Sequence, residues 1–367
     1  MGKPKEDGHA HNFLWETLKR KFERGYYKLR NGNGTSDILV SVIIPVYNAG
    51  NYLRQCLDSV IGQTLREIEI ICVNDGSTDD SLCILEEYAR KDDRIVVVSK
   101  ENENAGAGSA RNLGISLAKG EYLSILDADD FFDKNLLAET VNSAQKHDAD
   151  VVLFNSYIYD HVKKTVTTAD FAVNKSVLPE KSVFSRADFA ERIFQCTIGA
   201  AWCLLLRRDF VERHCLRFQA VHHADDFLFT YSVLALAQRI TFVDKKLLYY
   251  RINNEHSQTV KKSAHYQSAF AAPFELKNFL IRNWLYYELK RSFINKALAY
   301  TLWYLNTADN WRYFSDFYVA LKNTYFELLD IEDKPPDYFY DIAWYSQYRE
   351  ICRRTPEKYL FWRLYGL

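Results

Sequence analysis

The sequence has no apolar run long enough to cross a bilayer, and its first residues lack the apolar core of a signal peptide. A membrane-spanning helix needs about 20 mostly apolar residues, so we expect neither a membrane span nor secretion. The net charge is only −1 over 367 residues. No global positive field attracts nucleic acid, and we expect a cytoplasmic protein that does not bind it.

Cysteine pairs of the Cys-x-x-Cys type are also absent, although the chain has seven cysteines. Several of them lie within apolar stretches, which indicates buried free thiols in a reducing compartment. The hydrophobic content, 48%, is enough for one large core and a smaller one.

Apolar, β-branched runs alternate with helical patterns through much of the first half of the chain. The runs cover residues 39–46, 68–73, 95–99, 122–126 and 151–154, and the helical patterns lie near 51–62, 79–91, 106–119 and 134–147. This alternation predicts an α/β fold with a doubly wound, mostly parallel sheet that is covered on both faces. In such sheets the ligand binds outside the carboxyl ends of the strands.

Three regions are expected along the chain. Residues 1–37 are basic and amphipathic and end in a linker rich in Asn and Gly. Residues 38–260 form the α/β domain, and residues 261–367 are helical and rich in aromatic side chains.

Polar side chains follow three of the predicted strands. Tyr47 and Asn48 follow the first, Asp75 the second, and Asp127, Asp129 and Asp130 the fourth. Carboxylates gathered beside an apolar strand repel one another unless a cation is near. Mg²⁺ and Mn²⁺ bind such oxygens together with substrate phosphates. The pattern predicts a nucleotide-type site with a divalent cation; the alternative is a solvated loop in which Asp130 is a helix N-cap.

Residues 41–160 resemble the nucleotide-sugar-binding half of inverting family 2 glycosyltransferases, which have the GT-A fold. The motifs that carry the resemblance lie at 41–48, 63–64, 73–79, 110–114, 120–122 and 126–130, and more loosely at Trp202, 224–226 and 250–257. Each motif is short, but their order and spacing together are specific. The resemblance implies that residues 38–155 bind the donor and residues 156–260 the acceptor.

The resemblance also implies contacts with a UDP-sugar donor. Asp75 would accept a hydrogen bond from uracil N3–H. Asp129 would bind Mn²⁺ or Mg²⁺, Asp127 the ribose or a metal-bound water, and His256 is a weaker candidate metal ligand. The base pocket would be lined by Pro45, Val46, Tyr47 and Asn48. The remaining residues expected near the sugar or the phosphates are Gly106, Arg111, Ala128, Arg251 and Ser257.

Two of these assignments carry further expectations. A structural ion pair is the alternative role of Arg111. The segment 250–259 resembles the family's mobile loop, which closes over the diphosphate.

The acceptor hydroxyl needs a base, because an alcohol is a poor nucleophile. The family uses the second residue of a Glu-Asp pair, and the corresponding residues here are Asp225 and Asp226. Position favours Asp226, with Asp225 as the alternative because Asp stands where Glu is usual. Repulsion between adjacent carboxylates should raise one pKa toward neutrality. A helix N-cap is the plain alternative role.

Basic and aromatic side chains are mixed near both ends of the chain, for example at Trp15, Phe22 and residues 353–363. Such segments suit an anionic membrane surface, here the inner face of the cytoplasmic membrane. The alternatives are an inward-packed helical subdomain or a homodimer. The chain lacks the Gln-x-x-Arg-Trp motif of processive synthases. We therefore expect transfer of one hexose or N-acetylhexosamine per encounter to a hydroxyl of a glycan or lipid-linked oligosaccharide.

Two other functions compete with this one. Sugar-phosphate nucleotidyltransferases share the sheet type but begin with a glycine-rich phosphate loop, whereas the first strand here ends at Pro45. A non-catalytic scaffold would not need Asp75, Asp129 and Asp226 together.

Overall fold

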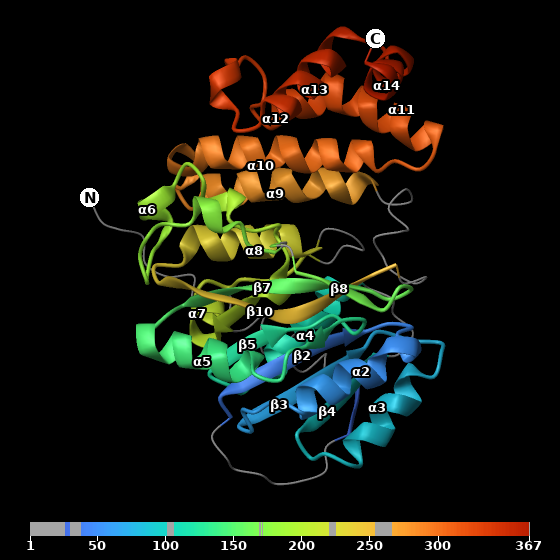
Figure 1. Ribbon diagram of the computed structural model, residues 1–367, viewed down its shortest axis with the longest axis vertical. Coiled ribbons are helices and arrows are strands. Elements are labelled where there is room, and N and C mark those ends of the chain that lie inside the picture. Colours follow the sequence, from blue (N-terminus) through green and yellow to red (C-terminus); the bar gives the residue numbers. More distant parts are fainter. Residues whose placement is uncertain are drawn as a thin grey trace, which may run out of the picture.

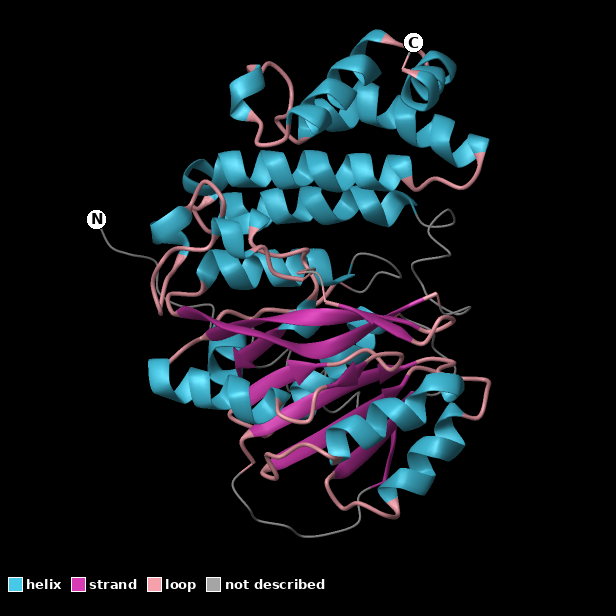
Figure 2. Cartoon of the chain, in the orientation of Figure 1, coloured by secondary structure: helices cyan, strands magenta, loops and turns pink. Residues whose placement is uncertain are grey.

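The computed structural model describes residues 26–29, 38–100, 106–168, 170, 172–219, 225–253 and 266–366. A twisted sheet forms one part of the molecule, and stacked helices cover one side of it (Figure 1, Figure 2). Within these described residues the sheet has ten strands, in the order β1-β4-β3-β2-β5-β9-β7-β10-β6, with β8 paired to β7.

The first half of the sheet is parallel, as predicted. Its strands are β2 (Val40–Val46), β3 (Ile68–Asn74), β4 (Ile95–Lys100) and β5 (Tyr122–Ile125), and its helices are α2 (Gly50–Ile61), α3 (Ser81–Ala89) and α4 (Ala107–Leu117). Alternate residues of β3 pack on different helices: Ile70 belongs to the main core with α2 and α3, whereas Ile71 packs with Leu113 of α4. Both faces are therefore covered, which explains the continuous apolar runs.

The second half of the sheet is mixed. Its strands are β6 (Phe131–Phe132), β7 (Val151–Asp160), β8 (Thr165–Thr167), β9 (Leu204–Arg207) and β10 (Ile240–Ile252). Strand β9 runs antiparallel to both β5 and β7, so β7 again points the same way as β5. Strand β10 is continuous from Ile240 to Ile252, and shifts in its register with β7 between Val243 and Leu248 bend it.

The sheet also includes a strand that the sequence analysis missed. Strand β1 (Tyr26–Leu29) pairs antiparallel with β4 at the sheet edge, inside the segment expected to be amphipathic and to end in a linker. An edge strand is paired on one side only, so it needs no continuous apolar run to mark it.

The remaining helices pack on the second half of the sheet or lie beyond it. They are α5 (Leu136–His147), α6 (Arg186–Phe189), α7 (Arg208–Arg213), α8 (Asp225–Leu236), α9 (Tyr266–Arg282), α10 (Tyr286–Asn306), α11 (Trp311–Ala320), α12 (Phe326–Leu328), α13 (Ile342–Arg353) and α14 (Pro356–Tyr365). Short helical turns occur at Lys175–Val177, Ile193–Gln195, Ala201–Cys203, Leu321–Tyr325 and Pro336–Tyr338. Figure 1 shows α8, α9 and α10 stacked outward from the sheet, with α11–α14 farthest away.

The C-terminal helices pack most of their large aromatic side chains inward. Phe317, Tyr318, Phe326 and Tyr359 are fully buried in a core that is continuous with the sheet. This agrees with the inward-packed subdomain considered from the sequence. Within the described ranges, no helix is both long enough and apolar enough to cross a membrane.

Candidate active site

Three predicted motifs meet at the carboxyl ends of parallel strands. Strand β2 lies between β3 and β5, with Val46 opposite Asn74 and Ile43 opposite Ile125. The Asp75 backbone N–H donates to the carbonyl of Val46 at 2.8 Å. The predicted base-binding residues therefore lie next to the aspartates after β5, as the sequence pattern indicates.

The end of β2 is tied to the turn after β3. Tyr47 is exposed (38%), and Pro45 is partly exposed beside buried Val46. The Asn48 side chain accepts a hydrogen bond from the Thr78 backbone N–H at 2.8 Å. A flat aromatic ring is thus presented to solvent from a rigid turn, which suits stacking of a planar base.

Asp75 forms a buried ion pair that the sequence analysis missed. Lys100, the last residue of β4, donates from Nζ to Asp75 Oδ1 at 2.7 Å and to Ser109 Oγ at 3.1 Å. Both charged side chains are 3% exposed. The only sequence signal was a lysine at the end of an apolar strand.

The three aspartates after β5 occupy different environments. Asp127 and Asp129 are half-buried, whereas Asp130 is 1% exposed and Ala128 is buried. Asp130 Oδ1 accepts from the Arg251 backbone N–H at 2.7 Å. Burial, reinforced by the charges of Asp129 and Asp127, raises the pKa of Asp130 well above its usual value.

The N-cap role considered for Asp130 is wrong. Strand β6 follows it directly, and α5 begins only at Leu136, with Asn135 as the preceding residue.

Arg251 supports the aspartate turn from behind. Its guanidinium donates to the carbonyl of Asp129 at 2.5 Å and to Gln55 Oε1 at 2.8 Å, and lies 2.9 Å from His161 Nδ1. It is 3% exposed. Aromatic rings within about 5.0–5.4 Å of it belong to Tyr52, Phe131 and Tyr159. With these contacts, Arg251 fits a role in positioning the aspartate turn better than its predicted role as a phosphate ligand.

Arg111 joins the aspartate turn to Asp225 and Asp226, the two predicted candidates for the catalytic base. Its Nη2 donates to Asp127 Oδ1 at 2.6 Å, and its Nη1 donates to Asp225 Oδ2. Arg111 is 6% exposed. The alternative role considered for this residue, an ion pair, is therefore the one observed, and it links two motifs far apart in the sequence.

Glycine allows the start of α4 to approach the segment before α8. A Cβ on Gly108 would lie 2.1 Å from the carbonyl oxygen of Gln219. Gly106, just before α4, has a φ of 88°, which favours glycine. This close approach brings Arg111 within reach of Asp225.

The two adjacent carboxylates at the start of α8 are not equivalent. Asp225 is 8% exposed and carries the ion pair with Arg111. Among the described residues, none forms an ion pair with the half-buried Asp226. Burial, and then repulsion from Asp225, raises the pKa of Asp226 to about 7, against the opposing charge of Arg111. Asp226 therefore has the properties of a proton acceptor near neutral pH.

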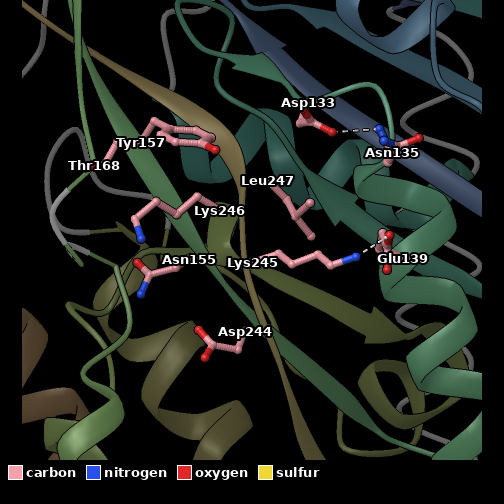
Figure 3. Close-up of a pocket in the computed structure, with 10 residues that line it drawn as sticks. All are labelled: Asp133, Asn135, Glu139, Asn155, Tyr157, Thr168, Asp244, Lys245, Lys246 and Leu247. Carbon is pink, nitrogen blue, oxygen red and sulfur yellow. Dashed lines mark hydrogen bonds and ion pairs between the residues drawn. The ribbon is translucent and has the colours of Figure 1, made fainter.

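A cavity of about 380 Å³ lies elsewhere, between the start of α5 and strands β7 and β10 (Figure 3). It is lined by Asp133, Asn135, Glu139, Asn155, Tyr157, Thr168, Asp244, Lys245, Lys246 and Leu247. None of these is a predicted site residue. Its lysines are paired: Lys245 with Glu139 at 2.6 Å and Lys246 with Asp170 at 2.8 Å.

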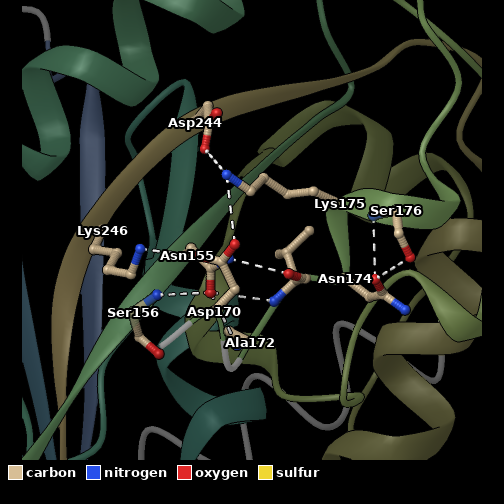
Figure 4. A network of polar contacts seen from close by, with 10 residues as sticks. Asn155, Ser156, Asp170, Ala172, Asn174, Lys175, Ser176, Asp244 and Lys246 are labelled. Atoms are coloured by element: carbon tan, nitrogen blue, oxygen red, sulfur yellow. Dashed lines mark hydrogen bonds and ion pairs between the residues drawn. The ribbon is translucent and has the colours of Figure 1, made fainter. Parts of the chain in front are cut away.

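A polar network beside this cavity includes several of the residues that line it (Figure 4). Lys175 bridges Asp244 and Asp170, and the Asn155 side chain bonds the backbone of Ala172 and Val173. The network therefore fixes the segment around residue 172 against the sheet, a structural role.

His256 and Ser257, predicted to contact the metal or the phosphates, lie outside the described residues. In the described part of the chain, no three His, Cys, Asp or Glu side chains are grouped to hold a metal by themselves. A hard cation that is shared with substrate phosphates needs only one or two carboxylates. The half-buried Asp129 and Asp127 provide such oxygens, so the donor set fits a shared cation.

Comparisons with known proteins identify the family of this chain. The family described as Glycosyl transferase family 2 matches residues 41–215. The protein named glycosyltransferase GlyG of Streptococcus pneumoniae serotype 4 is 36% identical over 219 residues, which cover 58% of this chain and 70% of that protein. The uncharacterized glycosyltransferase EpsJ of Bacillus subtilis is 33% identical over 245 residues, covering 65% and 70%.

A solved structure has the same fold. Staphylococcus aureus TarS 1–349, in complex with UDP-GlcNAc, superposes with a TM-score of 0.53 at 21% identity, covering 82% of this chain and 77% of that one. The matched family region includes Asp75 and the aspartate turn and ends before Asp225. With its GT-A fold, the chain belongs to glycosyl transferase family 2.

Proposed function

We propose that this glycosyltransferase moves a hexose or N-acetylhexosamine from a UDP-sugar to a hydroxyl of a glycan or lipid-linked glycan, with inversion, in surface polysaccharide synthesis. The observation that carries the proposal is the chain of ion pairs Asp127–Arg111–Asp225, which brings Asp225, the neighbour of Asp226 in the chain, to the aspartate turn. The TarS neighbour, which was solved with UDP-GlcNAc, supports the choice of donor. Family membership leaves no reason to keep the nucleotidyltransferase alternative.

Asp226 is the proposed base. Its carboxylate would take the proton of the acceptor hydroxyl as that oxygen attacks the anomeric carbon opposite the departing UDP. Attack from the opposite face inverts the anomeric centre. Burial raises the pKa of Asp225, and the charge of Arg111 opposes that rise, which favours a carboxylate at Asp225 beside the base.

Asp129, with Asp127 beside it, would hold a divalent cation, Mn²⁺ or Mg²⁺. When bound, that cation would supply positive charge to the departing diphosphate. Arg251 keeps the turn that presents Asp129 in place. At the other side of the site, Tyr47 would stack on uracil, and Asp75, oriented by Lys100, would face its N3–H.

A screen of donors tests the proposal directly. UDP release is measured from UDP-Gal, UDP-Glc, UDP-GalNAc and UDP-GlcNAc, each with Mn²⁺, with Mg²⁺ and with EDTA. GDP-mannose serves as the control donor, from which the release of GDP is measured. We expect release from at least one UDP-sugar, dependence on the metal, and none from GDP-mannose. Release from GDP-mannose alone would contradict the assignment of the base pocket.

The pH dependence of transfer should report Asp226. A base must be deprotonated, and the pKa of Asp226 is raised to about 7. We therefore expect kcat/KM to fall about tenfold per pH unit below pH 7 and to level off above it. The measurement is a kcat/KM profile from pH 5 to 9; an acid limb near pH 4 would contradict the assignment.

Attachment to an anionic membrane and homodimer formation remain predictions. Trp284, in the turn before α10, and Tyr287, near the start of α10, are 94% and 90% exposed and are candidates for such a contact. Co-sedimentation with anionic vesicles at low salt would test the first.

A further inference from the structure

Three aromatic side chains on α10 lie together, and one of them contacts Phe227, the residue that follows the proposed base. Phe227, which follows Asp226 in α8, contacts Tyr300 with ring centroids 4.3 Å apart. Tyr300 in turn stacks near Trp303 at 6.5 Å, and Trp303 packs edge-on against Tyr304 at 5.0 Å. The C-terminal helices therefore reach the site from outside the region that matches the family.

The electrostatics agree with this placement. The pKa of Tyr300 is raised well above its usual value by burial, by Tyr304 and then by the charge of Asp226. The pKa of Tyr304 is also raised, by burial and by the charges of Asp226 and Asp225. The two hydroxyls are 3.5 Å apart, with Tyr300 donating. Both phenols thus lie within electrostatic reach of the carboxylate that must meet the acceptor.

We propose that Trp303, with Tyr300 and Tyr304, forms the platform on which the acceptor saccharide lies while its hydroxyl meets Asp226. This inference rests on the proposed function. It names the acceptor as a saccharide, because the apolar C–H face of a sugar ring packs on an aromatic ring while its hydroxyls bond polar tips such as those of tyrosine.

Trp303 suits this role in its exposure and its position. It is 41% exposed, whereas Tyr304 is 5% exposed. Part of the indole of Trp303 therefore faces solvent, while its edge-on contact with the buried Tyr304 holds it in place. A reacting hydroxyl lies within about 3 Å of its base, so the rest of the acceptor must lie against the neighbours of Asp226. Phe227 follows Asp226 directly and contacts the α10 aromatic group through Tyr300.

The outer helices hold this end of α10 in place. Asn306, the last residue of α10, donates from Nδ2 to Gln347 Oε1 of α13 at 2.9 Å and accepts from Arg363 of α14 at 2.6 Å. Tyr359 donates to the same Gln347 oxygen at 3.0 Å. In this proposal the C-terminal helices hold the aromatic platform of α10 in position relative to Asp226.

The test compares Trp303→Ala with Trp284→Ala. Trp284 is also exposed, and it lies near the other end of α10, roughly 28 Å away at 1.5 Å per residue. Transfer to p-nitrophenyl glycosides, hydrolysis of the UDP-sugar in their absence, and UDP affinity are measured for both variants. For Trp303→Ala we expect the acceptor KM to rise about tenfold, with hydrolysis and UDP affinity within about twofold of wild type. Trp303→Phe should recover most of the loss.

The outcomes separate the two proposals. An unchanged acceptor KM for Trp303→Ala, in a wild-type enzyme that transfers sugar, overturns the platform alone. So does an equal effect of Trp284→Ala, which would point to a membrane or dimer contact. Failure of the wild type to use any UDP-sugar overturns the proposed function, and the platform with it.

Discussion

Replacing Asp226 with asparagine is expected to lower kcat for transfer about 10²–10⁴-fold while leaving UDP affinity unchanged. The amide is nearly isosteric but cannot accept the proton of the acceptor hydroxyl. The variant should also lose the acid limb near pH 7, because the group that titrates there is gone. Isothermal titration with UDP and a kcat profile against pH measure both effects.

The stability of this variant provides an independent check. The folded-state pKa of Asp226 is raised, so the folded protein binds its proton more tightly than the unfolded chain does. The charged form therefore costs stability as the pH rises from about 4 to 7. Asp226→Asn removes that cost, and its melting temperature at pH 8 should equal or exceed that of wild type.

Asp244→Asn is the matched control, because this exposed carboxylate pairs with Lys175 away from the site. It should leave both transfer and stability nearly unchanged. If Asp226→Asn still transfers sugar at the wild-type rate, the base lies elsewhere, with Asp225 the first candidate.

The parallel half of the sheet could be predicted because each of its strands is marked by the apolar residues of its own segment. Strands that are covered on both faces need mostly apolar runs, and β2, β3, β4 and β5 have them. Parallel strands place their carboxyl ends at one edge, so the motifs at Tyr47, Asp75 and Asp127 could be brought together without a structure. Short edge strands such as β1 carry no such signal.

The pairing partners of the charged residues could not be predicted. Arg111 contacts Asp225, 114 residues away, and Lys100 contacts Asp75, 25 residues away. A lone Arg within a helix pattern gives no indication of which carboxylates the fold brings to it. Asp130 was misread for a related reason: the two-residue strand β6 separates it from the helix that it was expected to cap.

Arg111 is the residue whose loss should damage stability and chemistry together. Arg111→Met keeps a long, apolar stem but leaves Asp127 and Asp225 facing each other without a cation. Breaking a buried pair by removing one partner costs about 3–5 kcal/mol, and the 28% exposure of the Asp127 side chain favours the lower figure. Urea unfolding followed by fluorescence should show this loss.

The same variant should shift the pH profile in a direction that follows from its charge. Arg111 lowers the pKa of Asp226, so its removal raises that pKa and moves the acid limb above pH 7. Arg111→Lys keeps the charge but cannot bond both carboxylates with one planar fork, and it should recover the pH profile better than the rate. Arg54→Met, which breaks an exposed pair with Glu87, is the control and should leave the stability nearly unchanged.

A double-mutant cycle separates the ion pair from simple packing. If Arg111 stabilises the fold chiefly by neutralising Asp225, then Asp225→Asn should be far less harmful in the Arg111→Met background than in wild type, because the buried charge left behind by the first change is removed by the second. Additive losses would mean that Arg111 acts through its contact with the Phe218 ring, 5.2 Å from its guanidinium carbon, and not through charge. In that case the link between the aspartate turn and the Asp225–Asp226 carboxylates would be steric. The acid limb of the pH profile of Arg111→Met would then stay near pH 7.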